Sequence, residues 1–303
     1  MELLVIVLII HIFEYTFLNM DPRIIQLYDE YTHVPLSRGE FLKRLAILAG
    51  SSAAATSLLP FLEADYGRSL VMVQNTNDLI IETIYYEGIN GTMEAYVAKK
   101  ASEIKLPAVV VIHENRGLNP HIKDVTHRVA RAGFLAIAPN ALGVLGGTPE
   151  NEDEARQLFT QLDGEANLIN FIRVFDYLKT REDYNGRVGC VGFCWGGAMS
   201  GNLAIHVPEL VAASCYYGRQ PASENVHKIN AALQLHYAEL DTRVNEGIDA
   251  FVEALNQHNK SYELYMYEGV HHAFHNDTSA SRYNEEAATL SWQRTIEFFK
   301  KHL

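Results

Sequence analysis

The segment from 188 to 197 constrains this chain more than any other. It reads Val-Gly-Cys-Val-Gly-Phe-Cys-Trp-Gly-Gly, an apolar run that leads into the spacing Gly-x-Cys-x-Gly around Cys194. Glycines two residues before and two residues after the cysteine suit a sharp turn from a strand into a helix, because larger side chains there would clash with the neighbouring backbone. Such a turn lifts its central residue above a sheet, so the segment predicts that Cys194 is a nucleophile. The alternative is a small buried cysteine that ends a strand.

Two later residues favour the nucleophile. Asp241 follows the apolar run 231–238, and His272 follows the strand-like run 262–267 through a short loop. A thiol needs a base to take its proton and an acid to orient that base. Nucleophile, acid and histidine occur here in the chain order of α/β-hydrolase triads. Either residue alone would be an ordinary turn former or core group, but together with Cys194 they predict a catalytic triad.

The rest of the pattern alternates between strands and helices. The expected strands are 70–73, 79–86, 94–98, 108–112, 134–138, 188–193, 211–217, 231–237 and 262–267. The expected helices are 120–132, 150–162, 165–180, one directly after Cys194, 244–257 and 285–301. The first three strands are expected to be antiparallel. The alternation that follows predicts an α/β fold of the α/β-hydrolase type, with a mostly parallel sheet flanked by helices on both faces.

Four segments together resemble the dienelactone hydrolase family, also called carboxymethylenebutenolidases. They are the run 113–117 (His-Glu-Asn-Arg-Gly) after the apolar 109–112, the turn 192–197, the segment 239–244 (Glu-Leu-Asp-Thr-Arg-Val), and 271–274 (His-His-Ala-Phe). The resemblance covers residues 68–303. It implies that Cys194 is the nucleophile and that Asp241 and His272 are its partners. It also implies that Glu114 is an extra carboxylate, which helps to switch the cysteine between a protected thiol and an attacking thiolate.

The chemistry of these roles can also be argued from the residues. An ordinary thiol is only a few per cent ionised at neutral pH, so an imidazole and the N-terminus of a helix are needed to raise the thiolate fraction at Cys194. The backbone amides of Trp195 and Asn115 are expected to hold the developing oxyanion. The thiolate would attack an ester or lactone carbonyl, form a thioester, and be released by water that His272 activates. This reaction requires no cofactor.

The sequence departs from the family where a substrate carboxylate would bind. The segment 151–159 begins with acidic residues, and only Arg156 supplies a cation there. The position four residues after the catalytic histidine, basic in the family, is Asn276. An uncharged or weakly polar ester or lactone is therefore at least as well supported as a small anionic dienelactone. The candidate apolar lining of the site consists of Trp195, Phe274 and Tyr283, each of which could instead be plain core.

Composition excludes some partners. The formal net charge of the chain is −12, which argues against nucleic-acid binding by the body of the protein. Cysteines at 190, 194 and 215 show no paired framework. Residues 68–303 have the size of one α/β-hydrolase domain. The sequence does not determine the oligomeric state.

The first 67 residues are expected to form an N-terminal extension. Residues 1–19 are apolar but short and lack a basic start, so Met20 is an alternative beginning of the protein. Residues 37–44 (Ser-Arg-Gly-Glu-Phe-Leu-Lys-Arg) precede an apolar stretch and resemble a twin-arginine export signal, in which Gly39 replaces the second arginine. The alternative is an amphipathic helix that packs on the hydrolase domain or a partner. Both a cytoplasmic and an exported, periplasmic location stay open.

Other chemistries fit less well. Metal binding at His271, His272, His275 and Asp277 fails the usual zinc-hydrolase spacing. The run at His113 also lacks a second histidine, and the glycines in 189–197 match no nucleotide-binding pattern. We therefore expect no metal.

Two alternatives concern the same fold. A non-catalytic protein that keeps the α/β-hydrolase fold only to bind a small molecule is expected to have lost at least one triad residue, yet all are present here. A thioesterase, carboxylesterase or peptidase would use the same triad, and only the shape of the pocket separates these enzymes.

Overall fold

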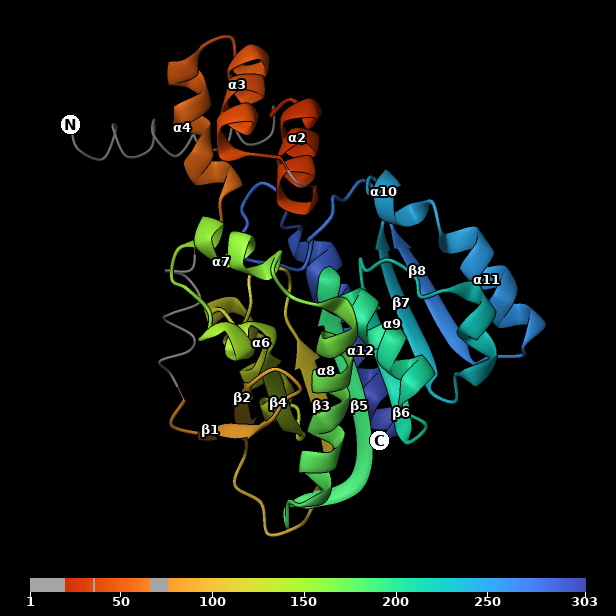
Figure 1. Cartoon of the computed structure of the whole chain (residues 1–303). Helices are drawn as coiled ribbons and strands as arrows, with labels where there is room; N and C mark the ends of the chain where they lie inside the picture. The colour runs from red at the N-terminus through yellow and green to blue at the C-terminus, as the bar shows by residue number, and fades with distance from the viewer. Residues whose placement is uncertain (1–19, 35, 66–75) are drawn as a thin grey trace, which may run out of the picture. The chain divides into compact units, whose positions relative to one another are not determined.

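The computed structural model describes residues 20–34, 36–65 and 76–303 (Figure 1). The described chain divides into two compact units, one formed by residues 20–65 with 278–283 and the other by 76–277 with 284–303. Three expectations lie outside the described residues: the extension 1–19, the domain boundary at 67/68 and the strand 70–73.

The N-terminal unit contains three helices, α2 (Pro22–His33), α3 (Arg38–Ala49) and α4 (Ser52–Leu62). The predicted amphipathic segment is therefore two helices rather than one, because Gly50 at φ 83° ends α3 and the Ser51 side chain caps α4. A small apolar core joins them, in which the rings of Tyr31 and Phe41 stack with centroids 4.3 Å apart. No single helix in the described residues is long and apolar enough to cross a membrane; α3 and α4 pass that test only as a pair bent by 109°.

A short segment late in the sequence belongs to this N-terminal unit. The amide of Asp65 donates a hydrogen bond to the carbonyl of Thr278 at 2.7 Å, and the Arg282 guanidinium lies 5.0 Å from the centre of the Tyr28 ring. Residues 278–283, which lie within the predicted domain 68–303, therefore group with the N-terminal unit in the structure. The contacts of this segment join residues more than two hundred positions apart, so local pattern does not reveal them.

The second unit is built on one eight-stranded sheet with the order β1-β2-β4-β3-β5-β6-β7-β8. Strands β1, β2 and β4 pair antiparallel, and the other pairs are parallel. The strands are β1 (Ile80–Glu87), β2 (Thr92–Lys99), β3 (Leu106–Ile112), β4 (Leu135–Asn140), β5 (Tyr184–Phe193), β6 (Leu210–Tyr216), β7 (Ala232–Ala238) and β8 (Tyr262–Tyr267). This confirms the predicted mostly parallel α/β sheet with antiparallel strands at its start.

Helices cover both faces of this sheet. They are α6 (Pro120–Arg131), α7 (Glu152–Phe159), α8 (Gly164–Lys179), α9 (Trp195–His206), α10 (Thr242–Asn245), α11 (Ile248–Gln257) and α12 (Glu285–His302), with 3-10 turns η1 (Ala141–Leu145) and η2 (Ser223–Lys228). Figure 1 shows α8 and α9 in front of the sheet and α12 behind it. The prediction of a single helix at 244–257 was wrong, because α10 ends before Gly247 and α11 begins after it. A side chain at Gly247 would lie 2.4 Å from the amide oxygen of Gln220.

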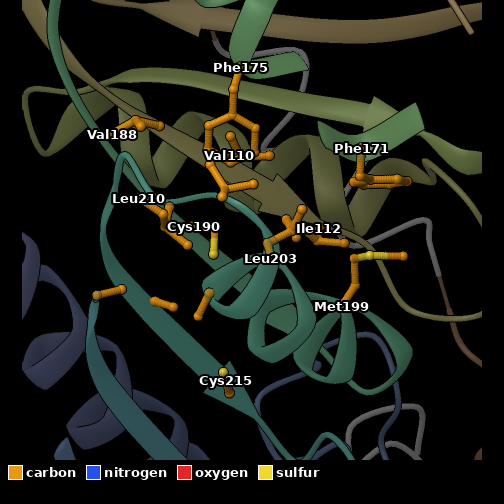
Figure 2. Close-up of a cluster of buried hydrophobic side chains, with 14 of the residues drawn as sticks. Val110, Ile112, Phe171, Phe175, Val188, Cys190, Met199, Leu203, Leu210 and Cys215 are labelled. Atoms are coloured by element: carbon orange, nitrogen blue, oxygen red, sulfur yellow. The ribbon is translucent and has the colours of Figure 1, made fainter. Parts of the chain in front are cut away.

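The core explains why the central strands read as unbroken apolar runs. In β3, Val110 and Ile112 face a cluster formed with α8, α9 and α11, whereas Val109 and Val111 face a second cluster formed with α6 and α12. Figure 2 shows the first cluster, with Val110 and Leu203 among its labelled side chains. A strand buried on both faces has no polar face, as expected for the middle of a parallel sheet.

The direction of the parallel strands determines where a site can form. The carboxyl ends of β3, β5, β7 and β8 lie at the same edge of the sheet. The chain leaves these ends through Glu114, Cys194, Asp241 and His272 respectively. Residues spread over more than half of the sequence are thereby brought to one edge.

Candidate active site

The turn at Cys194 joins β5 to α9 with a backbone that few residues adopt. Cys194 has φ 56° and ψ −115° and stands at the N-cap of α9. Its amide donates to the carbonyl of Tyr216 at 3.0 Å, which ties the turn to the end of β6. Positive φ in a residue with a Cβ is strained and is concentrated at functional sites.

The glycines around the cysteine have no room for a side chain. A Cβ added at Gly192 would lie 1.9 Å from the carbonyl oxygen of Gly196, and a Cβ at Gly196 would lie 2.4 Å from that of Ile112. A Cβ at Gly197 would lie 2.5 Å from the carbonyl oxygen of Tyr216. Side chains at these positions would therefore clash with the backbone, as the Gly-x-Cys-x-Gly spacing predicts.

Asp241 and His272 are joined by a hydrogen bond. The Nδ1 atom of His272 lies 2.5 Å from Oδ2 of Asp241, and the carboxylate is the acceptor. The other oxygen of Asp241 accepts from the amide of Val244 at 3.2 Å, so the carboxylate also caps α10. Both side chains are buried. The aspartate thus fixes the orientation of the imidazole, as an acid partner must.

The thiol and the imidazole are close. The Sγ atom of Cys194 lies within 4.8 Å of a ring nitrogen of His272. The ring of Tyr217 packs against the same imidazole, with centroids 4.9 Å apart. Tyr217 follows β6 and has φ 37°, so a second residue with a strained backbone lies beside this imidazole. No sequence pattern predicted its position there.

Glu114 is buried and lies just after β3, the strand that pairs with β5. Its Oε2 atom accepts a hydrogen bond from Nδ2 of Asn276 at 2.8 Å. Its Oε1 atom has no hydrogen-bond partner in the described part of the chain. Asn276, which the sequence predicts to be a substrate-binding position, is buried and bound to Glu114 in the structure. This contact joins the loop of His272 to the end of β3.

His113, which was not predicted as a site residue, fixes the backbone at Glu114. Its Nε2 accepts from the amide of Ala141 at 3.0 Å, so Nδ1 carries the hydrogen and donates to the carbonyl of Glu114 at 2.5 Å. Burial lowers the pKa of His113 to about 4, which keeps the ring neutral. The indole of Trp195 stacks on this ring with centroids 5.4 Å apart. Trp195 is also the first residue of α9, the position expected of an oxyanion amide.

The remaining predicted site residues lie in different surroundings. Phe274 is fully buried against Tyr217 and Tyr267, so its ring belongs to the core. Tyr283 lies in the segment that packs with the N-terminal unit. Arg156 is on α7, with its Nε atom 3.8 Å from the carboxylate of Asp153. Asn115 is in the turn after β3, where its side-chain oxygen accepts from Arg116 at 2.7 Å.

The two other cysteines differ from Cys194. Burial raises the pKa of Cys190 to about 12, and burial together with the neighbouring Cys190 raises that of Cys215 well above its ordinary value. Both lie inside strands, and Figure 2 shows the Cys190 side chain among apolar groups. Only Cys194 stands at a strand end beside an imidazole.

Comparison with known proteins shows the family of this chain. The model of the dienelactone hydrolase family matches residues 93–303. The chain belongs to this family. It is therefore a hydrolase of ester bonds on an α/β-hydrolase fold.

Individual relatives cover most of the chain. A protein of Escherichia coli O157:H7, provisionally named carboxymethylenebutenolidase, is 30% identical over 82% of this chain and 97% of its own length. A protein of Saccharolobus solfataricus with the same provisional name is 30% identical over 72% of this chain and 97% of its own. A crystal structure of a provisionally named dienelactone hydrolase of Klebsiella pneumoniae superposes with a TM-score of 0.68 at 27% identity, covering 75% of this chain and all of that one.

Proposed function

We propose that this chain hydrolyses an ester or lactone with Cys194 as nucleophile, through a thioester acyl-enzyme. The observation that supports this most is the combination at one sheet edge of a thiol on a strained turn, an imidazole nitrogen within 4.8 Å, and a carboxylate on the far side of that imidazole. This arrangement supports the proposal because it brings a nucleophile, a base and the acid that orients the base together at one edge of the sheet.

The steps follow from the roles of the atoms. Nδ1 of His272 is bound to Asp241, so Nε2 takes the proton of the Cys194 thiol. The thiolate attacks the carbonyl carbon and forms a tetrahedral oxyanion, which the amides of Trp195 and Asn115 stabilise. Collapse of this intermediate breaks the ester C–O bond, and His272 returns the proton to the leaving alcohol. Water, deprotonated by His272, then hydrolyses the thioester and restores the thiol.

The substrate that we favour is uncharged or weakly polar around its acyl group. The amide of Asn276 is engaged by Glu114, and the guanidinium of Arg156 lies against Asp153. Asn276 carries no charge, and the charge of Arg156 already lies near a carboxylate, so neither position favours a substrate carboxylate. A thioesterase or a carboxylesterase would use the same atoms, and the choice between them rests on the acyl and leaving groups that the enzyme accepts.

A substrate panel combined with alkylation tests the mechanism. The full chain is assayed on aryl esters, thioesters and unsaturated lactones before and after iodoacetamide treatment, and the alkylated peptide is identified by mass spectrometry. We expect activity to fall in step with alkylation of Cys194, while Cys190 and Cys215 react slowly because burial raises their pKa values.

Two variants complete the test. Cys194→Ala should lower turnover by at least about 100-fold with little change in melting temperature. Cys190→Ala, which removes a thiol from the strand that leads to Cys194, should keep turnover. Activity that survives in Cys194→Ala would exclude the thiol mechanism. Absence of turnover on every substrate, with Cys194 no more reactive than Cys190, would favour a binding scaffold.

A further inference from the structure

The loop that carries His272 runs from the end of β8 to Asp277. Ala273, the next residue, has φ 64°, in the left-handed region that a residue with a Cβ rarely adopts. The start of the loop is tied to the end of β7, because the amide of Gly269 donates to the carboxylate of Glu239 at 2.8 Å. A strained backbone persists only where its surroundings fix it, so the end of the loop must also be held.

Asp277 holds that end, with both carboxylate oxygens. Oδ1 lies 3.1 Å from Nδ1 of His121, and Oδ2 binds the guanidinium of Arg128. His121 and Arg128 are seven residues apart on α6, so they project from the same face of that helix. Arg128 also pairs with the buried carboxylate of Asp124 at 2.5 Å. The loop is therefore anchored to a helix that packs on the sheet.

The electrostatics of this contact are favourable. Burial alone would raise the pKa of Asp277, but the hydrogen bond from His121 and the charge of Arg128 outweigh burial and hold that pKa below its usual range. The ionised carboxylate can only accept hydrogen bonds, so Nδ1 of His121 carries the hydrogen.

A second contact extends the anchor to the nucleophile turn. The buried ring of His275 stacks on Phe193, with centroids 4.9 Å apart and planes 26° from parallel. Phe193 is the residue before Cys194. Burial holds the pKa of His275 well below its ordinary value, so this ring is neutral and packs as an apolar group. The His272 loop thus contacts both α6 and the strand that ends at the thiol.

We infer that Asp277 is a positioning residue: by binding His121 and Arg128 it fixes the His272 loop on α6 and thereby sets the distance between the imidazole of His272 and the thiol of Cys194. The inference rests on the proposed function, since it assigns a role to the same imidazole. It adds a residue that touches neither the thiol nor the Asp241 carboxylate.

Asp277→Asn in the full chain tests the inference, because it keeps the size of the side chain and removes its charge. We expect the variant to displace the loop by a fraction of an ångström, which should lower kcat by about 10-fold to 100-fold with little change in KM. The rate of Cys194 alkylation by iodoacetamide at pH 7 should fall as well, since the thiolate loses part of its imidazole partner. A merely structural role would not change this rate in the folded protein.

Asp183→Asn is the matched control. Asp183 accepts from Lys99 at 2.6 Å and from Arg181 at 2.8 Å, so it also binds two cations. It precedes the first residue of β5 and is at the opposite end of that strand from Cys194. Both variants should lower the melting temperature, but only Asp277→Asn should lower kcat and alkylation. Equal kcat and alkylation rates in the two variants would overturn the inference.

A second pair of variants covers the case in which Asp277→Asn does not fold. His121→Asn keeps a nitrogen donor near the position of Nδ1, and His121→Ala removes it. We expect His121→Asn to retain most of the alkylation rate and His121→Ala to lose it; equal rates would contradict the inference. The proposed function is judged separately, by the activity of the unmodified chain and of Cys194→Ala. Alkylation of Cys194 therefore tests the positioning role even if no substrate is hydrolysed.

Discussion

The backbone of Cys194 shows what a single residue contributes to this site. Its left-handed conformation costs on the order of 1–3 kcal/mol, which the surrounding structure must supply. The bond from its amide to Tyr216 and the close packing of Gly192 and Gly196 hold it in place. In return, the thiol is held at the N-terminus of α9, where the helix dipole favours negative charge.

Asn276 gives a prediction at the scale of one residue. Asn276→Asp would set a second carboxylate 2.8 Å from Glu114, and two like charges at that distance cannot both ionise at ordinary cost. One of the two carboxyl groups would therefore have a higher pKa in the folded chain than in the unfolded chain. The folded chain would keep this proton at a pH where the unfolded chain has lost it, so the variant should lose stability as pH rises. We expect its deficit in unfolding free energy to grow between pH 5 and pH 8 by about 1–3 kcal/mol, measured by urea unfolding.

The control for this charge is Asn151→Asp, at the exposed N-cap of α7. Aspartate caps a helix as well as asparagine, and residue 151 is exposed. Its stability relative to the unaltered chain should change by less than about 0.5 kcal/mol over the same pH range. A pH-independent deficit in Asn276→Asp would show that Glu114 and the new carboxylate do not interact.

Residue identities were easier to predict than residue contacts. Asp241 and His272 were predicted as acid and base from their order and their places after apolar runs, and the structure shows a hydrogen bond between them. The partners of Glu114 and Asp277 could not be found in this way. Each contact joins a loop to a residue about 150 positions earlier, and which side chains meet there depends on how the strands are ordered in the sheet.

Among the elements, the strand-turn-helix unit of β5 and α9 makes the sharpest demand on sequence. Gly192→Ala should reduce the unfolding free energy by at least about 2 kcal/mol, because the new methyl group meets a backbone carbonyl that cannot rotate away. Gly164→Ala, at the start of α8 with no atom within 4 Å of the added Cβ, should change stability by no more than about 1 kcal/mol. Thermal and urea unfolding of both variants measure the difference; similar values would argue against the steric explanation.

Long apolar strands and well-capped helices were predictable elements. The runs at β3, β5 and β7 were expected and are confirmed, because burial on both faces leaves a clear signal. The break between α10 and α11 was not expected. It occurs at Gly247, whose backbone approaches Gln220, and a close approach across the fold leaves no periodic signal.

For the whole molecule, buried neutral histidines make stability depend on pH. Burial lowers the pKa of His113 to about 4 from an ordinary 6.5. The unfolded chain therefore binds a proton at this position before the folded chain does, and stability is lost as pH falls from 6.5 towards 4. As pH falls over this range, the unfolding free energy of His113→Gln should rise by up to about 3 kcal/mol relative to that of the unaltered chain.

The measurement is urea unfolding of both proteins at pH 7.5, 5.5 and 4.5. His206→Gln, which alters an exposed histidine on α9, should leave the pH dependence unchanged. A constant difference between the unaltered chain and His113→Gln would mean that the folded and unfolded chains bind the His113 proton at the same pH, which would contradict the lowered pKa.

The parallel order of the sheet also affects how the protein can be made. Glu114, Cys194, Asp241 and His272 appear in this order during synthesis, and the last strand of the sheet, β8, precedes only the histidine loop and α12. Under the proposed mechanism, a growing chain therefore contains its thiol long before it contains its base, His272. A product truncated before β8 would carry Cys194 without that imidazole, and its thiol should react slowly with iodoacetamide.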